Sequence, residues 1–291
     1  MLPDLERSRT PAVMPDRARV PIRGSSGFDP PRAARRWVPS AGIASDGMDP
    51  GSPASARITW RSLAGVESEL APVGASETLR SGEVAPWRQF RWHRGQSHYS
   101  GLYWSATTGG HVAYESRLEL ARMLLADFAP QVCWIVAQPF LVEAVVAGQP
   151  RRHVPDIALI DRAGAITIVN VKPADRIGDP KVAATFAWAG CVFGVRGWQH
   201  EVWTGAPEVL LGNVRFLAGY RRRDRFDAQL LDAVVAMAND GDTIGDLGRR
   251  CHGIGPAEVV RPALLHLLWS GRLRTDLSTV LSDQSALERA A

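Results

Sequence analysis

The chain has 291 residues, of which 45% are hydrophobic and 22% charged, a balance typical of a globular protein of one or two domains. No apolar run reaches the roughly 20 residues of a membrane span, and the N-terminus shows no apolar signal-peptide core. The three cysteines, Cys133, Cys191 and Cys251, are too few and too far apart for a disulfide framework or a CxxC zinc site. These features exclude membrane, collagen, coiled-coil and secreted mini-protein classes, and we expect a cytoplasmic location.

The net charge of +4 is weak evidence for a nucleic-acid partner. Residues 1–57 carry nine arginines against six acidic residues, so the remainder of the chain is almost neutral. Only two lysines, Lys172 and Lys181, stand against 32 arginines. A lysine that persists in such a sequence is therefore a candidate for a specific role.

Composition divides the chain into three parts. Residues 1–57 hold nine of the 20 prolines and few large apolar residues, which predicts a disordered tail because such a segment cannot offset its ordering entropy. We expect an α/β domain over 58–222, with its core at about 87–222, and a C-terminal α domain over 223–291.

Aromatic residues alternate with Arg and His over 87–104, which fits either a nucleic-acid platform or, as we favour, a half-buried sheet edge covered by arginines. The Thr-Gly-Gly turn within 98–116 predicts a hairpin. Apolar residues at helical spacing predict a helix over 115–128, which Pro130 ends.

The next segments alternate between extended and helical patterns. Runs of β-branched residues predict strands, and a small-residue and aromatic pattern after Pro180 predicts a helix. In chain order these are extended stretches at 133–146 (ending in a turn at AGQP), 153–161 and 165–172, a helix at 181–197 and a short strand at 199–205. This order indicates an α/β layer structure.

The C-terminal part begins with five arginines between Arg215 and Arg225, a run typical of a solvated helix face. Three helices and a terminal extended segment are predicted at 226–240, 243–250, 256–271 and 272–278. This is the winged-helix pattern, which serves DNA and protein binding equally well.

The spacing between Asp156 and Lys172 indicates a candidate catalytic site. Asp156 begins one predicted strand and Lys172 ends the next, with a turn at 162–164 between them, so pairing the strands as a hairpin would bring both residues to one end of the sheet. A preceding helix can add a carboxylate, which completes the order of a PD-(D/E)xK nuclease. Carboxylates hold Mg²⁺, the metal activates water and stabilises charge on phosphate, and a lysine adds positive charge there. The alternative is an ordinary surface Asp and a solvated Lys, and spacing alone does not decide.

From about Tyr99 to Arg223 the chain resembles the TnsA endonucleases, the subunits of heteromeric transposases that cut DNA at transposon ends. The resemblance lies in the ordered segments ESRLELARMLLADFAPQV, AQPF, HVPDIAL, IVNVKP, GWQHEVWTG and NVRFLAGYRR. It implies a restriction-endonuclease-like PD-(D/E)xK core with a winged-helix-like C-terminal domain. It also implies the catalytic residues Glu119, Asp156 and Lys172.

The same resemblance implies two Mg²⁺ ions, for which Mn²⁺ can substitute, held by Glu119, Asp156 and the backbone carbonyl of Val171. Many such nucleases have an acidic residue where this chain has Asn170, which would lend only a carbonyl oxygen and so weaken metal binding. Glu115 competes with Glu119 because residues four apart share a helix face, although a first-turn role at the helix N-terminus is preferred for it.

Further candidates surround this set. Gln138 is expected to orient the helix carboxylate through a hydrogen bond, and His153 either faces the scissile phosphate or is structural. The candidate DNA contacts are Lys181, Arg221, Arg222, Arg223 and Arg225.

The resemblance implies hydrolysis of the strand at the 5′ transposon ends, beside a TnsB-like DDE transposase and a TnsC-like AAA+ ATPase. Two other functions stay open. One is a restriction- or repair-type nuclease on the same fold, and the other is a non-catalytic winged-helix protein that binds DNA or assists assembly.

Overall fold

The computed structural model describes residues 53–88 and 99–290, which form a mixed α/β structure. The predicted tail lies mostly outside these residues, but its last five positions are part of the fold. A 3₁₀ turn, η1 (Pro53–Ser55), precedes strand β1, which starts at Arg57, and Ala56 between them is 4% exposed. Its carbonyl accepts a hydrogen bond from the Arg196 guanidinium. The predicted boundary was therefore a few residues too late.

The central sheet has the strand order β10-β9-β8-β5. Its strands are β5 (Val132–Ala137), β8 (Ile157–Asp161), β9 (Ile166–Val171) and β10 (Gln199–Trp203). β8 runs antiparallel to both β5 and β9, whereas β10 is parallel to β9. Successive residues of β8 face opposite sides, so Ile157 packs in one apolar cluster and Ala158 in another. The sheet is thus covered on both faces.

A second sheet has the order β2-β1-β6-β7. Its strands are β1 (Arg57–Arg61), β2 (Glu67–Glu69), β6 (Leu141–Val146) and β7 (Gln149–His153). Strand β7 was not predicted, because Pro150 and two exposed arginines resemble a turn. It pairs with β6 at the sheet edge, where proline and charged side chains are tolerated.

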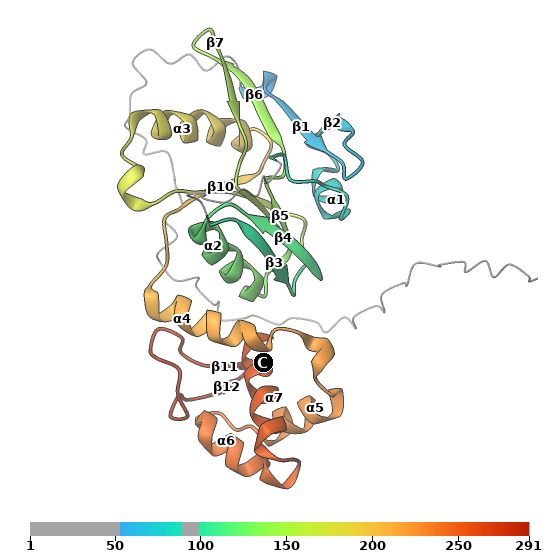
Figure 1. Ribbon diagram of the computed structural model, residues 1–291, viewed down its shortest axis with the longest axis vertical. Helices are drawn as coiled ribbons and strands as arrows, with labels where there is room; N and C mark the ends of the chain where they lie inside the picture. The colour runs from blue at the N-terminus through green and yellow to red at the C-terminus, as the bar shows by residue number, and fades with distance from the viewer. Residues whose placement is uncertain (1–52, 89–98, 291) are drawn as a thin grey trace, which may run out of the picture. The chain divides into compact units, whose positions relative to one another are not determined.

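The remaining elements of this domain cover the sheets (Figure 1). They are helices α1 (Ala75–Arg80), α2 (Arg117–Phe128) and α3 (Pro180–Gly194), and the hairpin of β3 (Gly101–Ser105) and β4 (Gly110–Tyr114). Residues of α2 share the apolar cluster of Ile157, and residues of α3 share that of Ala158. The hairpin, α2, α3 and the strand β10 match the predicted segments. No helix among the described residues is both long and apolar enough to cross a membrane.

The C-terminal part consists of helices followed by a two-stranded ribbon. In order these are α4 (Glu208–Leu217), the turns η3 (Ala218–Tyr220) and η4 (Arg223–Arg225), α5 (Ala228–Met237), α6 (Ile244–Arg250), η5 (Cys251–Gly253), α7 (Ala257–Trp269), β11 (Leu273–Arg274) and β12 (Glu288–Arg289). One apolar cluster continues from α2 through α4 into α5 and α7. The three predicted helices and the extended segment are confirmed, and the antiparallel partner of that segment is β12.

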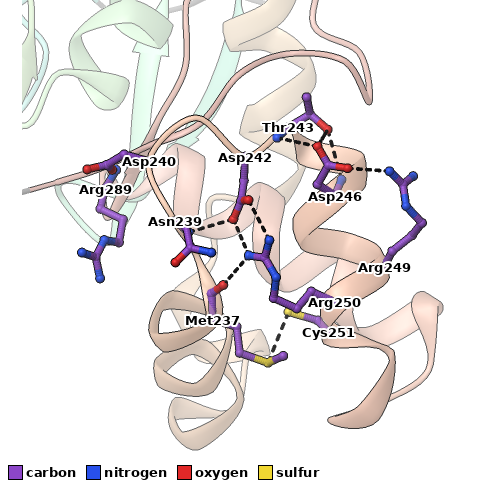
Figure 2. Close-up of polar contacts among 10 residues, drawn as sticks. All are labelled: Met237, Asn239, Asp240, Asp242, Thr243, Asp246, Arg249, Arg250, Cys251 and Arg289. Atoms are coloured by element: carbon purple, nitrogen blue, oxygen red, sulfur yellow. Dashed lines mark hydrogen bonds and ion pairs between the residues drawn. The ribbon is translucent and has the colours of Figure 1, made fainter.

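The connection from α5 to α6 is held by paired charges (Figure 2). Arg250 forms an ion pair with Asp242 and also donates to the Met237 carbonyl, at 2.7 Å. The Arg250 hydrogen bond holds the pKa of Asp242 well below its usual range, at about 2. Next to it, Thr243 and Asp246 form a capping box that starts α6, within the helix predicted over 243–250. The Arg250–Asp242 ion pair and the capping box therefore both stabilise the connection between α5 and α6.

Candidate functional site

Asp156 and the end of strand β9 meet, as the predicted hairpin required. Ile157 pairs with Val169, so the chain just before β8 lies beside the chain at the end of β9. The Val171 N–H donates to Asp156 Oδ2 at 2.7 Å, and Lys172 follows directly. The β10 strand supports this end, since the Lys172 N–H donates to the Trp203 carbonyl at 2.9 Å.

These residues open onto a cavity of about 870 Å³. Its lining includes Glu119 from α2, Asp156 before β8, and Val171 and Lys172 at the end of β9. The predicted convergence of Glu119, Asp156 and Lys172 on one pocket is therefore observed. The cavity thus brings the carboxyl groups of Glu119 and Asp156 together with the ammonium group of Lys172, groups of the kind that hydrolysis of a phosphodiester requires.

Glu119 is 8% exposed and also serves the start of its helix. Ser116 is the N-cap residue of α2 and accepts from the Glu119 N–H at 3.0 Å. In return Glu119 Oε1 accepts from the Ser116 hydroxyl and Oε2 accepts from the Glu115 N–H, at 3.0 and 2.8 Å. Burial raises the pKa of Glu119, and these hydrogen bonds oppose the rise. The side chain is thus fixed before any ligand arrives.

Asp156 has the more perturbed carboxyl group. Burial raises its pKa to about 7, and the nearby charge of Glu119 acts in the same direction. The Val171 N–H and the charges of Arg88 and Lys172 favour the ionised form, but more weakly than burial opposes it. Two close, buried carboxyl groups are a place where a bound cation would relieve desolvation and repulsion.

The raised pKa of Asp156 predicts a pH-dependent stability. In the unfolded chain the group titrates near 3.8, and in the folded chain near 7, so the folded state binds more protons between these values. Stability should therefore fall as pH rises from about 4 to 7 and not fall further from this source above 7. Asp156→Asn removes this loss, so in metal-free urea unfolding its stability relative to the wild type should be greater at pH 8 than at pH 4. An equal difference at both pH values would contradict a raised pKa.

Glu115 lines the same cavity but not as a helical neighbour of Glu119. Helix α2 starts at Arg117, so the predicted sharing of a helix face and the first-turn role were both wrong. Instead Glu115 forms an ion pair with Arg88, with 2.9 Å between Arg88 Nη1 and Glu115 Oε2. Arg88 is a cavity residue that the sequence did not single out. Arg88 lies 27 residues before Glu115 in the sequence, so no local sequence pattern indicated their contact.

Gln138 supports the site, but by contacts other than the predicted one. It is 2% exposed and adopts φ 44°, which is rare for a residue other than glycine. Its side-chain oxygen accepts from the Arg88 N–H at 3.0 Å, and its own N–H donates to the Asp156 carbonyl at 2.9 Å. It therefore joins Arg88 to Asp156 and does not orient the Glu119 carboxylate as expected.

Asn170 does not reach the cavity, which corrects its place in the predicted metal-ligand set. It is 0% exposed, and its side chain lies between His153 and His200, at 2.8 and 2.7 Å. Burial lowers the pKa of both histidines to about 4, so both rings are neutral near pH 7. His153 lines the cavity while its Nε2 contacts Asn170 Oδ1. Asn170 thus ties two neutral imidazoles together beneath the site.

Of the candidate DNA contacts, only Lys181 lines the cavity, near Arg176 of the turn η2 (Ala174–Arg176). The arginines after α4 are used within the chain. Arg221 donates to the Trp104 carbonyl at 3.0 Å and lies over the rings of Tyr103 and Trp104. The other contacts are Arg222 with Asp224 and the Trp104 ring, and Arg223 with the Phe226 carbonyl, while Arg225 is exposed in η4. Arg221 and Arg222 therefore contact the hairpin, whereas Arg215, Arg223 and Arg225 are exposed, as expected of a solvated face.

The cavity offers a set of oxygen donors that suits a divalent cation. Glu119, Asp156 and the Val171 carbonyl are hard oxygen donors, which suit Mg²⁺ or Mn²⁺. Within residues 53–88 and 99–290 there is no group of three or more His, Cys, Asp or Glu side chains placed to hold a metal. An ion here would thus rest on two carboxylates and backbone oxygen, with water completing its shell, as Mg²⁺ accepts.

The sequence matches no protein-family model, and no curated protein matches it at a significant level.

Proposed function

We propose that the chain is a metal-dependent DNA endonuclease of the TnsA type. The observation that carries this proposal is the meeting of Glu119, Asp156 and Lys172 at one cavity, where burial has made the two carboxyl groups costly to ionise. A bound cation offsets that cost, so the site is better suited to a metal-bound state than to an empty one. The antiparallel β8–β9 pair beside the parallel β10 agrees with a PD-(D/E)xK core.

Each residue has a role in this proposal. Glu119 and Asp156 would hold Mg²⁺, with the carbonyl of Val171, and the ion when bound lowers the pKa of water and stabilises charge on the phosphate. Lys172, at the strand end, orients the attacking water and faces the phosphate oxygens as their negative charge increases. Ser116 and the Glu115 N–H keep the Glu119 carboxylate in place, which reduces the reorganisation needed during the reaction.

The biological setting is proposed from the sequence resemblance. The substrate would be double-stranded DNA at transposon ends, cut at the 5′ side, with a TnsB-like DDE transposase and a TnsC-like AAA+ ATPase as partners. The helices α5 to α7 and the β11–β12 ribbon have the order of a winged helix and would serve assembly or DNA binding. Genes for a DDE transposase and an AAA+ ATPase beside this one would favour transposition over a restriction- or repair-type nuclease.

A non-catalytic role is the second candidate, and one observation favours it. Both oxygens of Glu119 already accept hydrogen bonds at the start of α2, which a purely structural capping residue would also show. Asn170 adds no metal ligand, so the site has fewer acidic residues than many nucleases of this fold. Metal binding separates the two candidates, because a capping glutamate and an aspartate with a purely structural role need no cation.

We expect Mg²⁺ at millimolar concentration to raise the melting temperature of the full chain at pH 8, and Mg²⁺ or Mn²⁺ to be required for cleavage of double-stranded DNA. Asp156→Asn should abolish both effects, because it removes the charge that draws in the cation. Asp175→Asn is the matched control, since Asp175 is exposed in η2 and does not line the cavity. A Mg²⁺ effect that survives in Asp156→Asn would place the metal elsewhere and end the proposal.

A further inference from the structure

Trp87 and Arg88 are anchored by contacts from two distant parts of the chain. The Trp87 N–H donates to the Gln138 carbonyl at 3.0 Å, and the Trp87 carbonyl accepts from Arg61 Nη1 at 3.1 Å. The Arg61 guanidinium also lies over the Trp87 ring, 4.4 Å from its centroid. With the Arg88 N–H held by the Gln138 side chain, the backbone of this dipeptide is fixed from both β1 and the β5–β6 turn.

The side chain of Arg88, by contrast, is 49% exposed and reaches into the cavity. Its backbone is fixed by a residue that also holds the backbone of Asp156. Gln138 adopts its strained φ while making all three backbone-directed hydrogen bonds, one to Asp156 and two from the Trp87–Arg88 segment. One residue thus connects the backbone of Arg88 to the backbone of Asp156.

The cationic residues of the cavity come from two separate segments of the chain. Lys172, Arg176 and Lys181 all come from the segment 172–181, whereas Arg88 comes from the segment before the hairpin. The carboxyl groups of Glu119 and Asp156 lie in the same cavity. A DNA backbone entering the cavity would thus be bound by cations from two separate segments of the chain. Glu115 uses one nitrogen of Arg88, and a guanidinium has five N–H donors, so it can hold Glu115 and a phosphate together.

We propose that Arg88 binds a backbone phosphate of the DNA next to the cleaved one, and that Gln138 is the positioning residue that places it relative to Asp156. This assignment rests on the proposed nuclease function and adds a phosphate-binding residue outside the set of Glu119, Asp156 and Lys172. Glu115 acts as the counter-ion that keeps the guanidinium turned into the cavity before DNA arrives.

The test is binding of a double-stranded DNA oligonucleotide to the full chain, with Ca²⁺ replacing Mg²⁺, over a series of salt concentrations. Arg88→Ala should weaken binding about tenfold and lower the slope of log K against log salt by about 0.9, because one phosphate contact is lost. Arg88→Lys should restore the slope but only part of the affinity, since it keeps the charge and loses the planar fork. Arg162→Ala is the matched control, because Arg162 is exposed in the β8–β9 turn, away from the Asp156 end.

Gln138→Gly tests positioning, because glycine accepts the positive φ while the side-chain acceptor is lost. Gln138→Gly should also weaken binding, and adding it to Arg88→Ala should cost little more, since both act through one contact. Equal slopes for Arg88→Ala and Arg162→Ala, or fully additive losses for Arg88→Ala and Gln138→Gly, would overturn the assignment. DNA binding that depends on Arg88 without cleavage under any metal would refute the nuclease and leave the phosphate site standing. No DNA binding by the wild type would refute both.

Discussion

Replacing Lys172 by alanine should lower metal-dependent DNA cleavage by about 10²–10³-fold, the scale of one lost preorganised electrostatic group. Lys172 stands directly after Val171, whose N–H is bonded to Asp156, so its position relative to the carboxylate is set by the backbone. Its side chain is partly exposed at the cavity, so the free energy of unfolding should change little. Single-turnover cleavage of a labelled DNA duplex, with urea unfolding of the same sample, measures both quantities.

Two comparisons make the Lys172→Ala result specific. Lys172→Arg keeps the positive charge and should retain more activity than alanine, whereas Arg162→Ala should cleave like the wild type. With a TnsB-like partner present, 3′-end cutting and joining should continue, because that partner has its own metal site, and products should shift towards single-strand joining. Normal cleavage of both strands by folded Lys172→Ala would show that this lysine is not catalytic.

Replacing Asp127 by alanine should cost roughly 3–5 kcal/mol of stability, because it leaves several buried donors without an acceptor. Asp127 is 6% exposed on α2 and accepts four hydrogen bonds from the β3–β4 hairpin. The donors are Tyr103 Oη at 2.6 Å, Ser105 Oγ at 2.7 Å, Ala106 N at 3.0 Å and Thr107 N at 2.7 Å. Burial and the Asp127 charge also raise the pKa of Tyr103, which keeps its hydroxyl a donor. Urea unfolding at pH 7 measures the loss.

Asp232→Ala is the control for Asp127, because Asp232 is 70% exposed in its ion pair with Arg272 and should contribute less than about 1 kcal/mol. The loss of stability in Asp127→Asn should lie between those of Asp127→Ala and Asp232→Ala. An amide keeps one acceptor oxygen but turns its NH₂ group towards a donor. A loss in Asp127→Ala no larger than in Asp232→Ala would mean that the hairpin is held by its apolar contacts alone.

Features that depend on neighbouring residues were predictable from the sequence. Thr243 caps α6, because a capping side chain bonds a backbone group three residues away, whereas Ser116, the cap of α2, lay inside the helix predicted over 115–128. The β8–β9 pair followed from two strand-like runs joined by a short turn, and antiparallel pairing then placed Asp156 and Lys172 at one end. The meeting of Asp156 and Lys172 was within reach for this reason, whereas Glu119 was assigned through the family resemblance.

Only the tertiary structure determined which other residues contact the candidate site. Gln138 bonds Arg88 across 50 residues, and Asn170 bonds His200 across 30, so no periodicity or turn signal relates these pairs. The family resemblance implied that Asn170 is a metal ligand, but the pleat turns it away from the cavity, between two imidazoles. The sequence of β7 is typical of a turn, but the segment forms a strand because it pairs with the edge of β6. Local sequence spacing determines the position of a residue within its helix or strand. The packing of distant segments determines which groups its side chain contacts.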